Sequence, residues 1–213
     1  MKITLKKPMP KTLESMLHSK DSIWLNQTEL NKGEKIIINA ESGKGKTTFT
    51  HILSGVRRSF SGQILFDDKN IADFKIDDWI KIRTQTISTI YQDLLLFPEL
   101  TVIENILIKN SLKESFSMDK IDHFLNEIGI IEKKNKPCSQ LSMGQCQRVA
   151  IVRALCQPFK WIVMDEPFSH LDNKNTEIAF NLINQRCMES SSGMILTSLD
   201  VSHITNFDKE LFL

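Results

Sequence analysis

The stretch that decides the fold reads Lys35-Ile36-Ile37-Ile38-Asn39-Ala40-Glu41-Ser42-Gly43-Lys44-Gly45-Lys46-Thr47-Thr48. Its β-branched beginning predicts a buried strand, and the glycine-containing part predicts a loop. After the loop, Phe49, Ile52 and Leu53 recur at helical spacing until Gly55 ends the helix. A strand that feeds such a loop into a helix gathers backbone N–H groups and the positive end of the helix dipole around one point. This arrangement predicts an anion site.

The loop also carries the residue types that bind a nucleoside triphosphate. We expect phosphate contacts from Ser42, Gly43, Lys44, Gly45, Lys46, Thr47 and Thr48. Lys46 supplies a positive charge for the β- and γ-phosphates, and the Thr47 hydroxyl is a ligand for Mg²⁺. Ala40 replaces the first glycine of the GxxxxGK(S/T) pattern, which is the smallest possible departure. This motif alone leaves open a solvated surface loop.

A second candidate element is the apolar run of residues 161–164, which predicts a buried strand and ends in Asp165-Glu166-Pro167. Ligands of open α/β sheets bind at the carboxyl edge, where these two carboxylates are expected. We expect Asp165 to hold Mg²⁺ through water, and Glu166 to orient or deprotonate an attacking water. The alternative is a strand-terminal turn in which Asp and Pro act only as breakers.

The remaining pattern predicts the fold class. Further strands are expected at residues 64–66, 87–91, 194–197 and 210–213. Helices are expected near residues 101–107, 121–128, 144–157 and 176–188. Trp24 is expected in a strand. Strand–helix alternation at both ends with a helical middle predicts an α/β core interrupted by a helical lobe.

The segment Leu141-Ser142-Met143-Gly144-Gln145-Cys146-Gln147-Arg148 resembles the signature LSGGQxQR of ABC transporter ATP-binding subunits. Ser142 and Gln145 also form a capping box, so a well-capped helix start is the plainer interpretation. The resemblance implies that Ser142, Gly144 and Gln145 form a second anion site, which closes on ATP held by an opposite subunit. Met143 replaces the first glycine of the family pattern.

The resemblance extends along the chain and implies further roles. Gln92 matches a family glutamine that reaches Mg²⁺ and the helical lobe, so we expect it to serve both metal binding and catalysis. Residues 94–100 would form a groove for a membrane subunit, unless they are simply buried core, and residues 169–172 match a loop at the dimer interface. The family fold is an α/β P-loop NTPase core with an inserted α-helical lobe. Residues 1–213 would form one ABC ATPase domain, with a core lobe at about 1–93 and 158–213 and a helical lobe at about 94–157.

The sequence departs from the family pattern after the last core strand. Where the family has a histidine, this chain has Leu199, which cannot donate a hydrogen bond to the γ-phosphate. Loss of one such donor typically costs ~10²–10³ in rate, so reduced hydrolysis is expected. His203 lies four residues further on. No clear aromatic residue is available near residues 12–18 to stack on adenine, although His18 or Leu17 could contact the base.

Composition narrows the class of protein. A net charge of +1 over 213 residues gives no sign of a nucleic-acid surface. No apolar run approaches the ~20 residues needed to cross a bilayer, and no apolar segment of a signal peptide follows the basic N-terminus. We therefore expect membrane association only through a partner. The four cysteines show no CxxC pairing and are expected to be free thiols.

The short length and residues 91–105 resemble the lipoprotein-release and macrolide-export group of the family. The resemblance implies ATP and Mg²⁺ as cofactors, and a second ATP-binding subunit and transmembrane permease subunits as partners. It also implies a peripheral place on the cytoplasmic face of the inner membrane. The alternative is a degenerate subunit that binds ATP as a clamp but hydrolyses it slowly or not at all. A soluble ABC ATPase of DNA maintenance or translation is disfavoured, because no long coiled-coil insertion or second cassette is present.

Overall fold

The computed structural model describes residues 1–41, 43–198 and 206–213. At its centre is a parallel sheet with the strand order β6-β7-β8-β3-β9. Its members are β6 (Ile87–Ile90), β7 (Trp161–Asp165), β8 (Gly193–Ser198), β3 (Lys35–Asn39) and β9 (Lys209–Phe212). Because these strands all pair in parallel, their carboxyl ends meet at one edge of the sheet.

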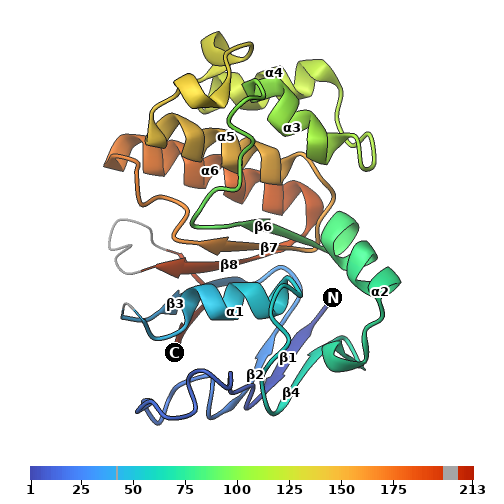
Figure 1. Ribbon diagram of the computed structural model, residues 1–213, viewed down its shortest axis with the longest axis vertical. Helices are drawn as coiled ribbons and strands as arrows, with labels where there is room; N and C mark the ends of the chain where they lie inside the picture. The colour runs from blue at the N-terminus through green and yellow to red at the C-terminus, as the bar shows by residue number, and fades with distance from the viewer. Residues whose placement is uncertain (42, 199–205) are drawn as a thin grey trace.

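A smaller antiparallel sheet has the order β2-β1-β4-β5. It consists of β2 (Gln27–Leu30), β1 (Ile3–Lys6), β4 (Gln63–Phe66) and β5 (Lys69–Asn70). Helix α1 (Lys46–Leu53) lies between the two sheets (Figure 1). Its Phe49 and Ile52 are fully buried in a cluster that includes Leu5 of β1. Packing on both sides therefore fixes the N-terminus of α1 at the edge of the parallel sheet.

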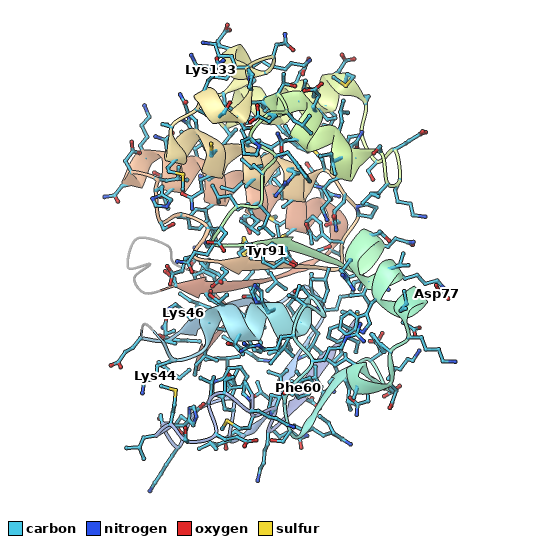
Figure 2. All side chains as sticks on the ribbon, in the orientation of Figure 1. Lys44, Lys46, Phe60, Asp77, Tyr91 and Lys133 are labelled. Carbon is cyan, nitrogen blue, oxygen red and sulfur yellow. The ribbon has the colours of Figure 1, made fainter. Side chains whose placement is uncertain are left out.

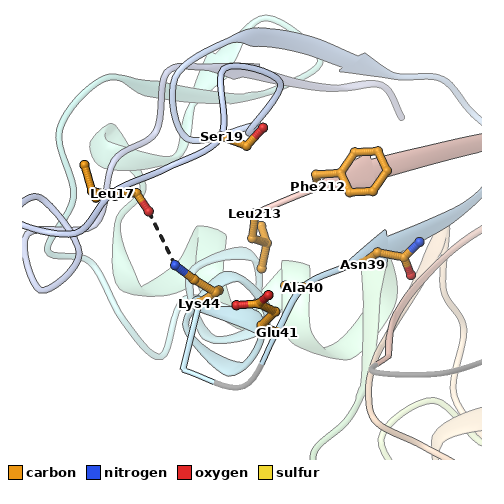
Figure 3. A pocket seen from close by; sticks show the side chains of 8 residues that line it. All are labelled: Leu17, Ser19, Asn39, Ala40, Glu41, Lys44, Phe212 and Leu213. Atoms are coloured by element: carbon orange, nitrogen blue, oxygen red, sulfur yellow. Dashed lines mark hydrogen bonds between the residues drawn. The ribbon is translucent and has the colours of Figure 1, made fainter.

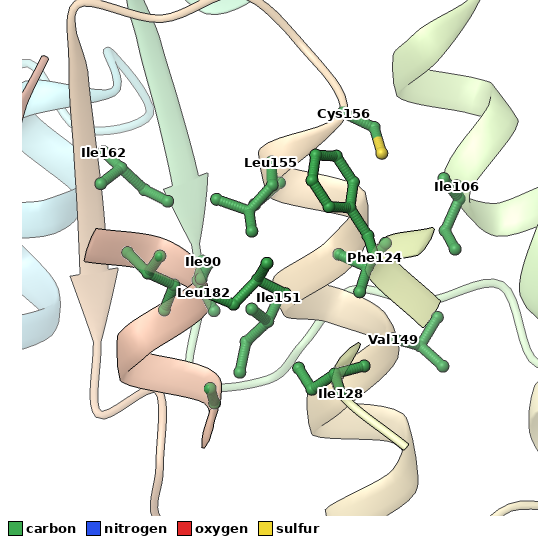
Figure 4. Close-up of a cluster of buried hydrophobic side chains, with 14 of the residues drawn as sticks. Ile90, Ile106, Phe124, Ile128, Val149, Ile151, Leu155, Cys156, Ile162 and Leu182 are labelled. Carbon is green, nitrogen blue, oxygen red and sulfur yellow. The ribbon is translucent and has the colours of Figure 1, made fainter. Parts of the chain in front are cut away.

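Helices cover the other face of the parallel sheet (Figure 1). They are α3 (Val102–Asn110), α4 (Met118–Glu127), α5 (Met143–Leu155) and α6 (Asn173–Ser190). Ile162 from the sheet packs with Leu155 of α5 and Leu182 of α6 in a second apolar cluster (Figure 4). Helix α2 (Ile76–Lys81) continues into a π-helix (Ile82–Thr86), and short 3₁₀ turns lie at Ile71–Asp73, Ile131–Lys133 and Cys138–Gln140.

Strand β7 separates the two apolar clusters. Ile162 and Met164 belong to the cluster under the helices, whereas Trp161 and Val163 belong to the cluster around α1. This is the alternation that a strand imposes on successive side chains. Every residue of β7 is buried, and its last residue is Asp165. Burial on both faces thus places this carboxylate at the sheet edge.

The α/β fold predicted from the sequence is confirmed, and the strands expected at residues 35–39, 161–164 and 210–213 correspond to β3, β7 and β9. Strands β1 and β2 were not predicted. The expectation for Trp24 is wrong, because it lies in a turn before β2 and packs edge-on against Phe49, with 5.8 Å between ring centroids. The Trp24 ring is therefore buried against α1, and the residue does not belong to a strand. The division into lobes near residues 93 and 158 stays a prediction.

Candidate functional site

The loop after β3 presents backbone donors at the start of α1. Gly43 and Gly45 have φ values of 81° and 105°, which glycine adopts without strain. A Cβ on Gly45 would lie 2.6 Å from the end of the Leu13 side chain and 3.2 Å from the Trp24 ring, so any other residue would have to displace Leu13. Among the described residues, nothing accepts a hydrogen bond from the backbone N–H groups of Lys46, Thr47 and Thr48. Such donors, together with the helix dipole, are suited to an anion, and the anion site stays a prediction.

Lys46 lies at the start of α1 (Figure 2). Its Nζ donates to the carbonyl oxygens of Ala40 at 2.9 Å and Glu41 at 3.2 Å. The same Nζ lies 3.3 Å from Oε1 of Glu166, in an ion pair that is largely buried. The structure therefore brings together the cation and the carboxylate that sequence analysis placed 120 residues apart (166 − 46).

The other loop residues have separate environments. Thr47 is half-buried on the first turn of α1, and the Thr48 hydroxyl accepts from Arg57 at 3.1 Å. Lys44 Nζ donates to the Leu17 carbonyl at 3.4 Å. Ser42 lies outside the described residues. The Thr47 hydroxyl thus lies at the start of α1, and its role as a metal ligand stays a prediction.

Among the described residues, only one of the two carboxylate oxygens of Asp165 has a hydrogen-bond partner. Asp165 is 1% exposed, and its Oδ1 accepts a hydrogen bond from the Thr197 hydroxyl at 2.8 Å. Its Oδ2 is buried and has no partner among the described residues. Thr197 stands opposite Asp165 in the register of β7 and β8. A buried carboxylate oxygen without a partner fits a missing cation or its water shell, which is the ligand type that Mg²⁺ prefers.

Glu166 follows in an unusual backbone conformation. Its φ is 47°, in the left-handed region that a residue with a Cβ seldom adopts. Its N–H donates to the Thr197 carbonyl at 3.1 Å, and its own carbonyl accepts from Gln147 at 3.3 Å. These bonds hold the residue in this conformation, a pattern found at functional sites. The side chain turns toward Lys46 rather than along the strand.

Gln92 follows the end of β6 and is exposed. The preceding residue, Tyr91, packs against His51 of α1 with 5.6 Å between ring centroids. Because Ile90 pairs with Met164, Gln92 begins the loop beside the one that starts at Glu166. Its position at the same sheet edge agrees with the expected neighbourhood, while its contacts with metal and water stay predictions.

The signature-like segment begins α5 with the expected capping box. The Ser142 hydroxyl accepts from the Gln145 N–H at 3.3 Å, and the Ser142 N–H donates to Gln145 Oε1 at 3.0 Å. Met143 is 55% exposed, so its side chain points into solvent. Among the described residues, no hydrogen bond joins Ser142, Gly144 or Gln145 to the phosphate loop. Within the described part of the chain, the two predicted anion sites are therefore not linked by hydrogen bonds.

Sequence analysis missed two residues that organise this region, Thr197 and Gln147. Thr197 holds Asp165, and the buried side chain of Gln147 contacts the segment that begins at Glu166. Their partners lie 32 and 19 residues away in sequence. No local pattern signals such contacts, although a glutamine on the apolar side of a helix is a weak indication of a buried hydrogen-bonding role.

A cavity of about 520 Å³ lies beside the phosphate loop (Figure 3). Its lining comes from three separated segments: Leu17, Ser19, Asn39, Ala40, Glu41, Lys44, Phe212 and Leu213. Of the two residues expected near a base, Leu17 therefore lines the cavity. His18 instead has its Nε2 2.9 Å from the Leu13 carbonyl. Phe212 is the aromatic residue in the lining and was not anticipated.

Residues 94–100 are partly exposed. Leu94 is buried, whereas Leu95 and Phe97 are 55% and 53% exposed. Leu94 and Leu95 both have positive φ, and Arg153 of α5 donates to their carbonyl oxygens at 2.5 and 2.6 Å. Burial, together with the nearby cations Arg153 and Arg83, lowers the pKa of Lys109 on α3. The segment therefore combines two exposed apolar side chains with a backbone held by the Arg153 guanidinium.

The four cysteines are free, and three of them are buried. Burial raises the pKa of Cys138 to about 11 and those of Cys156 and Cys187 to about 12.

In the part of the chain that is described, no helix has the length and apolar character required to cross a membrane.

The chain is similar to known ATP-binding proteins of membrane transport. A sequence model of the ABC transporter family matches residues 26–169. The "Lipoprotein-releasing system ATP-binding protein LolD" of Buchnera aphidicola subsp. Schizaphis graminum is 36% identical over 187 residues, covering 85% of this chain and 79% of that protein. The LolD protein of Koribacter versatilis is 34% identical over 175 residues, covering 81% and 77%.

Solved structures agree with these sequence relatives. The dimer of MJ0796, a bacterial ABC transporter cassette, matches with a TM-score of 0.82 at 25% identity, covering 100% of this chain and 94% of that chain. A post-hydrolysis dimer of the same cassette, bound to ADP and Pi, matches with a TM-score of 0.81 at 25% identity, covering 99% and 94%. The family match includes the phosphate loop, the start of α5 and the end of β7.

Proposed function

Because this chain belongs to the ABC transporter family, we propose that it powers a transporter of the lipoprotein-release type. It is an ABC-type ATP-binding subunit and an ATPase. The proposed cargo class follows from the names of its LolD relatives, which cover most of the chain. The proposed location is the cytoplasmic face of the inner membrane, where the subunit is held by transmembrane permease partners.

The observation that carries the proposal is the composition of one sheet edge. The N–H groups at the start of α1, the ammonium of Lys46 and Oδ2 of Asp165 lie at the same edge of the parallel sheet, and the N–H groups and Oδ2 have no hydrogen-bond partner in the described part of the chain. The first two suit phosphate, and the third suits a hydrated cation. Together they match what a nucleoside triphosphate with its metal requires.

Lys46 and Glu166 are proposed to exchange partners when ATP binds. In the structure Lys46 Nζ pairs with Glu166 Oε1 at 3.3 Å. The β- and γ-phosphates are stronger partners for this ammonium, because they carry more negative charge. Their arrival at the loop would release the Glu166 carboxylate. Glu166 would then be free to orient a water and accept its proton as the water attacks the γ-phosphate.

The proposed metal residues are Thr47, Asp165 and Gln92. Mg²⁺ bound there would neutralise charge on the phosphate oxygens. Thr47 would contribute its hydroxyl directly, and Asp165 would act through water from its buried position. Thr197 would keep the second oxygen of Asp165 aimed at the site by holding the first.

A second subunit is proposed to complete each site. The start of α5 offers the N–H groups of Met143 and Gly144, and no hydrogen bond joins it to the described residues of its own phosphate loop. A symmetric dimer would place Ser142, Gly144 and Gln145 of one subunit on the γ-phosphate held by the other. The dimers of the solved relatives give this arrangement its support.

The adenine base is proposed to occupy the cavity beside the phosphate loop. Leu17 would supply an aliphatic contact, and Phe212 would supply an aromatic one. Lys44 lines the same cavity and connects it to the phosphate contacts. Base stacking on an aromatic ring is sequence-tolerant, because every base has a π-face. We therefore expect only weak discrimination between ATP and GTP.

The permease is proposed to dock on the exposed apolar surface at residues 94–100. Leu95 and Phe97 are more than half exposed. Exposed clusters of this kind mark interaction sites. In the proposed division of the chain, this surface lies where the helical lobe, residues 94–157, leaves the core lobe, residues 1–93 and 158–213.

Steady-state ATP hydrolysis by the purified transporter complex tests the proposal, with the Glu166→Gln complex beside it. We expect turnover in the wild type and a loss of roughly 10²-fold or more in the variant, because the general base is removed. A slow rate that Glu166→Gln leaves unchanged would contradict the catalytic assignment. That result would favour the clamp alternative, for which Leu199 is the sequence argument; Leu199 lies outside the described residues.

A further inference from the structure

The segment that follows Glu166 is held by one buried side chain of another element. Gln147 of α5 is 1% exposed. Its Nε2 donates to the Glu166 carbonyl at 3.3 Å and to the Ser169 hydroxyl at 3.2 Å. Its Oε1 accepts from the His170 N–H at 2.8 Å. The amide thus uses both ends to fix the backbone from residue 166 to residue 170.

The same segment touches the start of α5 a second time. A Cβ on Gly144 would lie 2.8 Å from the His170 carbonyl oxygen, so only glycine allows this approach. Gly144 and Gln147 are three residues apart and therefore face the same side of the helix. The first turn of α5 and residues 166–170 are consequently packed as one unit through backbone contact and hydrogen bonds.

This unit joins two parts of the proposed machinery that act on different nucleotides. Ser142, Gly144 and Gln145 would contact ATP held by the partner subunit, whereas Glu166 would act on ATP held by its own Lys46. A displacement of α5 by the partner's nucleotide would reach Glu166 through Gln147. The left-handed φ of Glu166, 47°, makes its direction dependent on such outside support.

We propose that Gln147 is a positioning residue that couples the two ATP sites of the dimer. It transmits closure of the α5 half-site on one nucleotide to the orientation of Glu166 at the other. This inference rests on the proposed function, and it adds a route by which occupancy of one site sets turnover at its neighbour.

The experiment compares three variants in the purified transporter complex. Gln147→Met keeps the side-chain length but removes all three hydrogen bonds. Gln147→Glu keeps the acceptor for the His170 N–H and restores a donor toward Glu166 only when the carboxyl is protonated. Gln157→Met is the matched control, because Gln157 is also fully buried and its Nε2 donates to two carbonyl groups, of Arg83 at 3.1 Å and Ile87 at 3.3 Å.

Rates measured against ATP concentration separate positioning from folding. For Gln147→Met we expect kcat to fall roughly tenfold or more, because a misdirected base raises the barrier. The ATP concentration at half-maximal rate should change less than about twofold, since the hydrogen bonds of Gln147 go to Glu166, Ser169 and His170 and none joins it to a described residue of the phosphate loop. The Hill coefficient should fall to one. For Gln147→Glu, the rate relative to wild type should rise as the pH is lowered.

Gln157→Met should lower the melting temperature as much as Gln147→Met while leaving kcat and the Hill coefficient unchanged. The inference is overturned if the two methionine variants behave alike, or if the wild type already has a Hill coefficient of one. A Glu166→Gln complex that still hydrolyses ATP normally would instead refute the proposed function. The two failures are therefore distinguishable.

Discussion

Replacing Thr197 by valine tests how the buried carboxylate of Asp165 is held. Valine has nearly the same shape as threonine, so the change removes a hydroxyl without opening a cavity. The lost bond is the 2.8 Å contact between the Thr197 hydroxyl and Asp165 Oδ1. Since Oδ2 already lacks a partner among the described residues, the variant leaves a 1% exposed carboxylate with neither side-chain oxygen paired.

The expected cost follows from the charge on the acceptor. A hydrogen bond to a charged group contributes about 1.5–3 kcal/mol to stability. For a domain of this length each kcal/mol shifts the melting temperature by about 2–4 °C, so a decrease of roughly 3–12 °C is expected without nucleotide. Adding Mg²⁺ and ATP should restore part of the lost melting temperature, because a ligand that binds only the folded chain stabilises that state.

Thermal unfolding is the assay, with and without Mg²⁺ and ATP, and Thr50→Val is the matched control. Thr50 is fully buried on α1, but its hydroxyl has no hydrogen-bond partner among the described residues. The same substitution there should leave the melting temperature unchanged or raise it. If Thr197→Val melts within a degree of wild type, the hydroxyl does not support Asp165 and the reasoning fails.

Three further outcomes are expected. Phe212→Ala should raise the KM for ATP roughly five- to 150-fold with kcat retained, since base stacking contributes about 1–3 kcal/mol; an unchanged KM would place the base elsewhere. Met143→Gly, made in the Glu166→Gln chain, should lower the ATP concentration needed for dimer formation roughly two- to tenfold, because no flexible side chain is then immobilised at the interface. Light scattering measures the dimer. Weaker dimerisation would show that Met143 makes a favourable contact. Burial raises the pKa values of Cys156 and Cys187 to about 12, above their value of 9.0 in a solvated thiol. The unfolded chain therefore loses these protons first, so the free energy of unfolding in urea should fall from about pH 9 toward pH 12; a flat profile would contradict the burial of these thiols.

Short stretches of sequence predicted those parts of the site that lie at the end of a single strand or in the loop after it. The phosphate loop, Asp165 and Glu166 each follow directly from a strand, so their position at the sheet edge could be argued from sequence. The capping box of Ser142 and Gln145 was equally local and is present.

The rest depends on contacts between distant segments. The bond from Thr197 to Asp165 requires the register of β7 and β8, which the strand patterns alone do not give. The cavity beside the phosphate loop is lined by both Leu17 and Phe212, and it forms only when β9 pairs with β3. Strand β2 escaped prediction because its sequence, Gln27-Thr28-Glu29-Leu30, offers a single strongly apolar residue.

The two-sided burial of β7 has a consequence for sequence change. Inserting or deleting one residue within this strand would exchange Ile162 and Met164 with Trp161 and Val163 across the sheet, and it would move Asp165 off the edge. Such a change would damage both apolar clusters and the proposed metal site in one step, whereas a substitution would affect one of them. We therefore expect β7 to tolerate conservative replacements but no change of length, which makes it a natural anchor for aligning related chains.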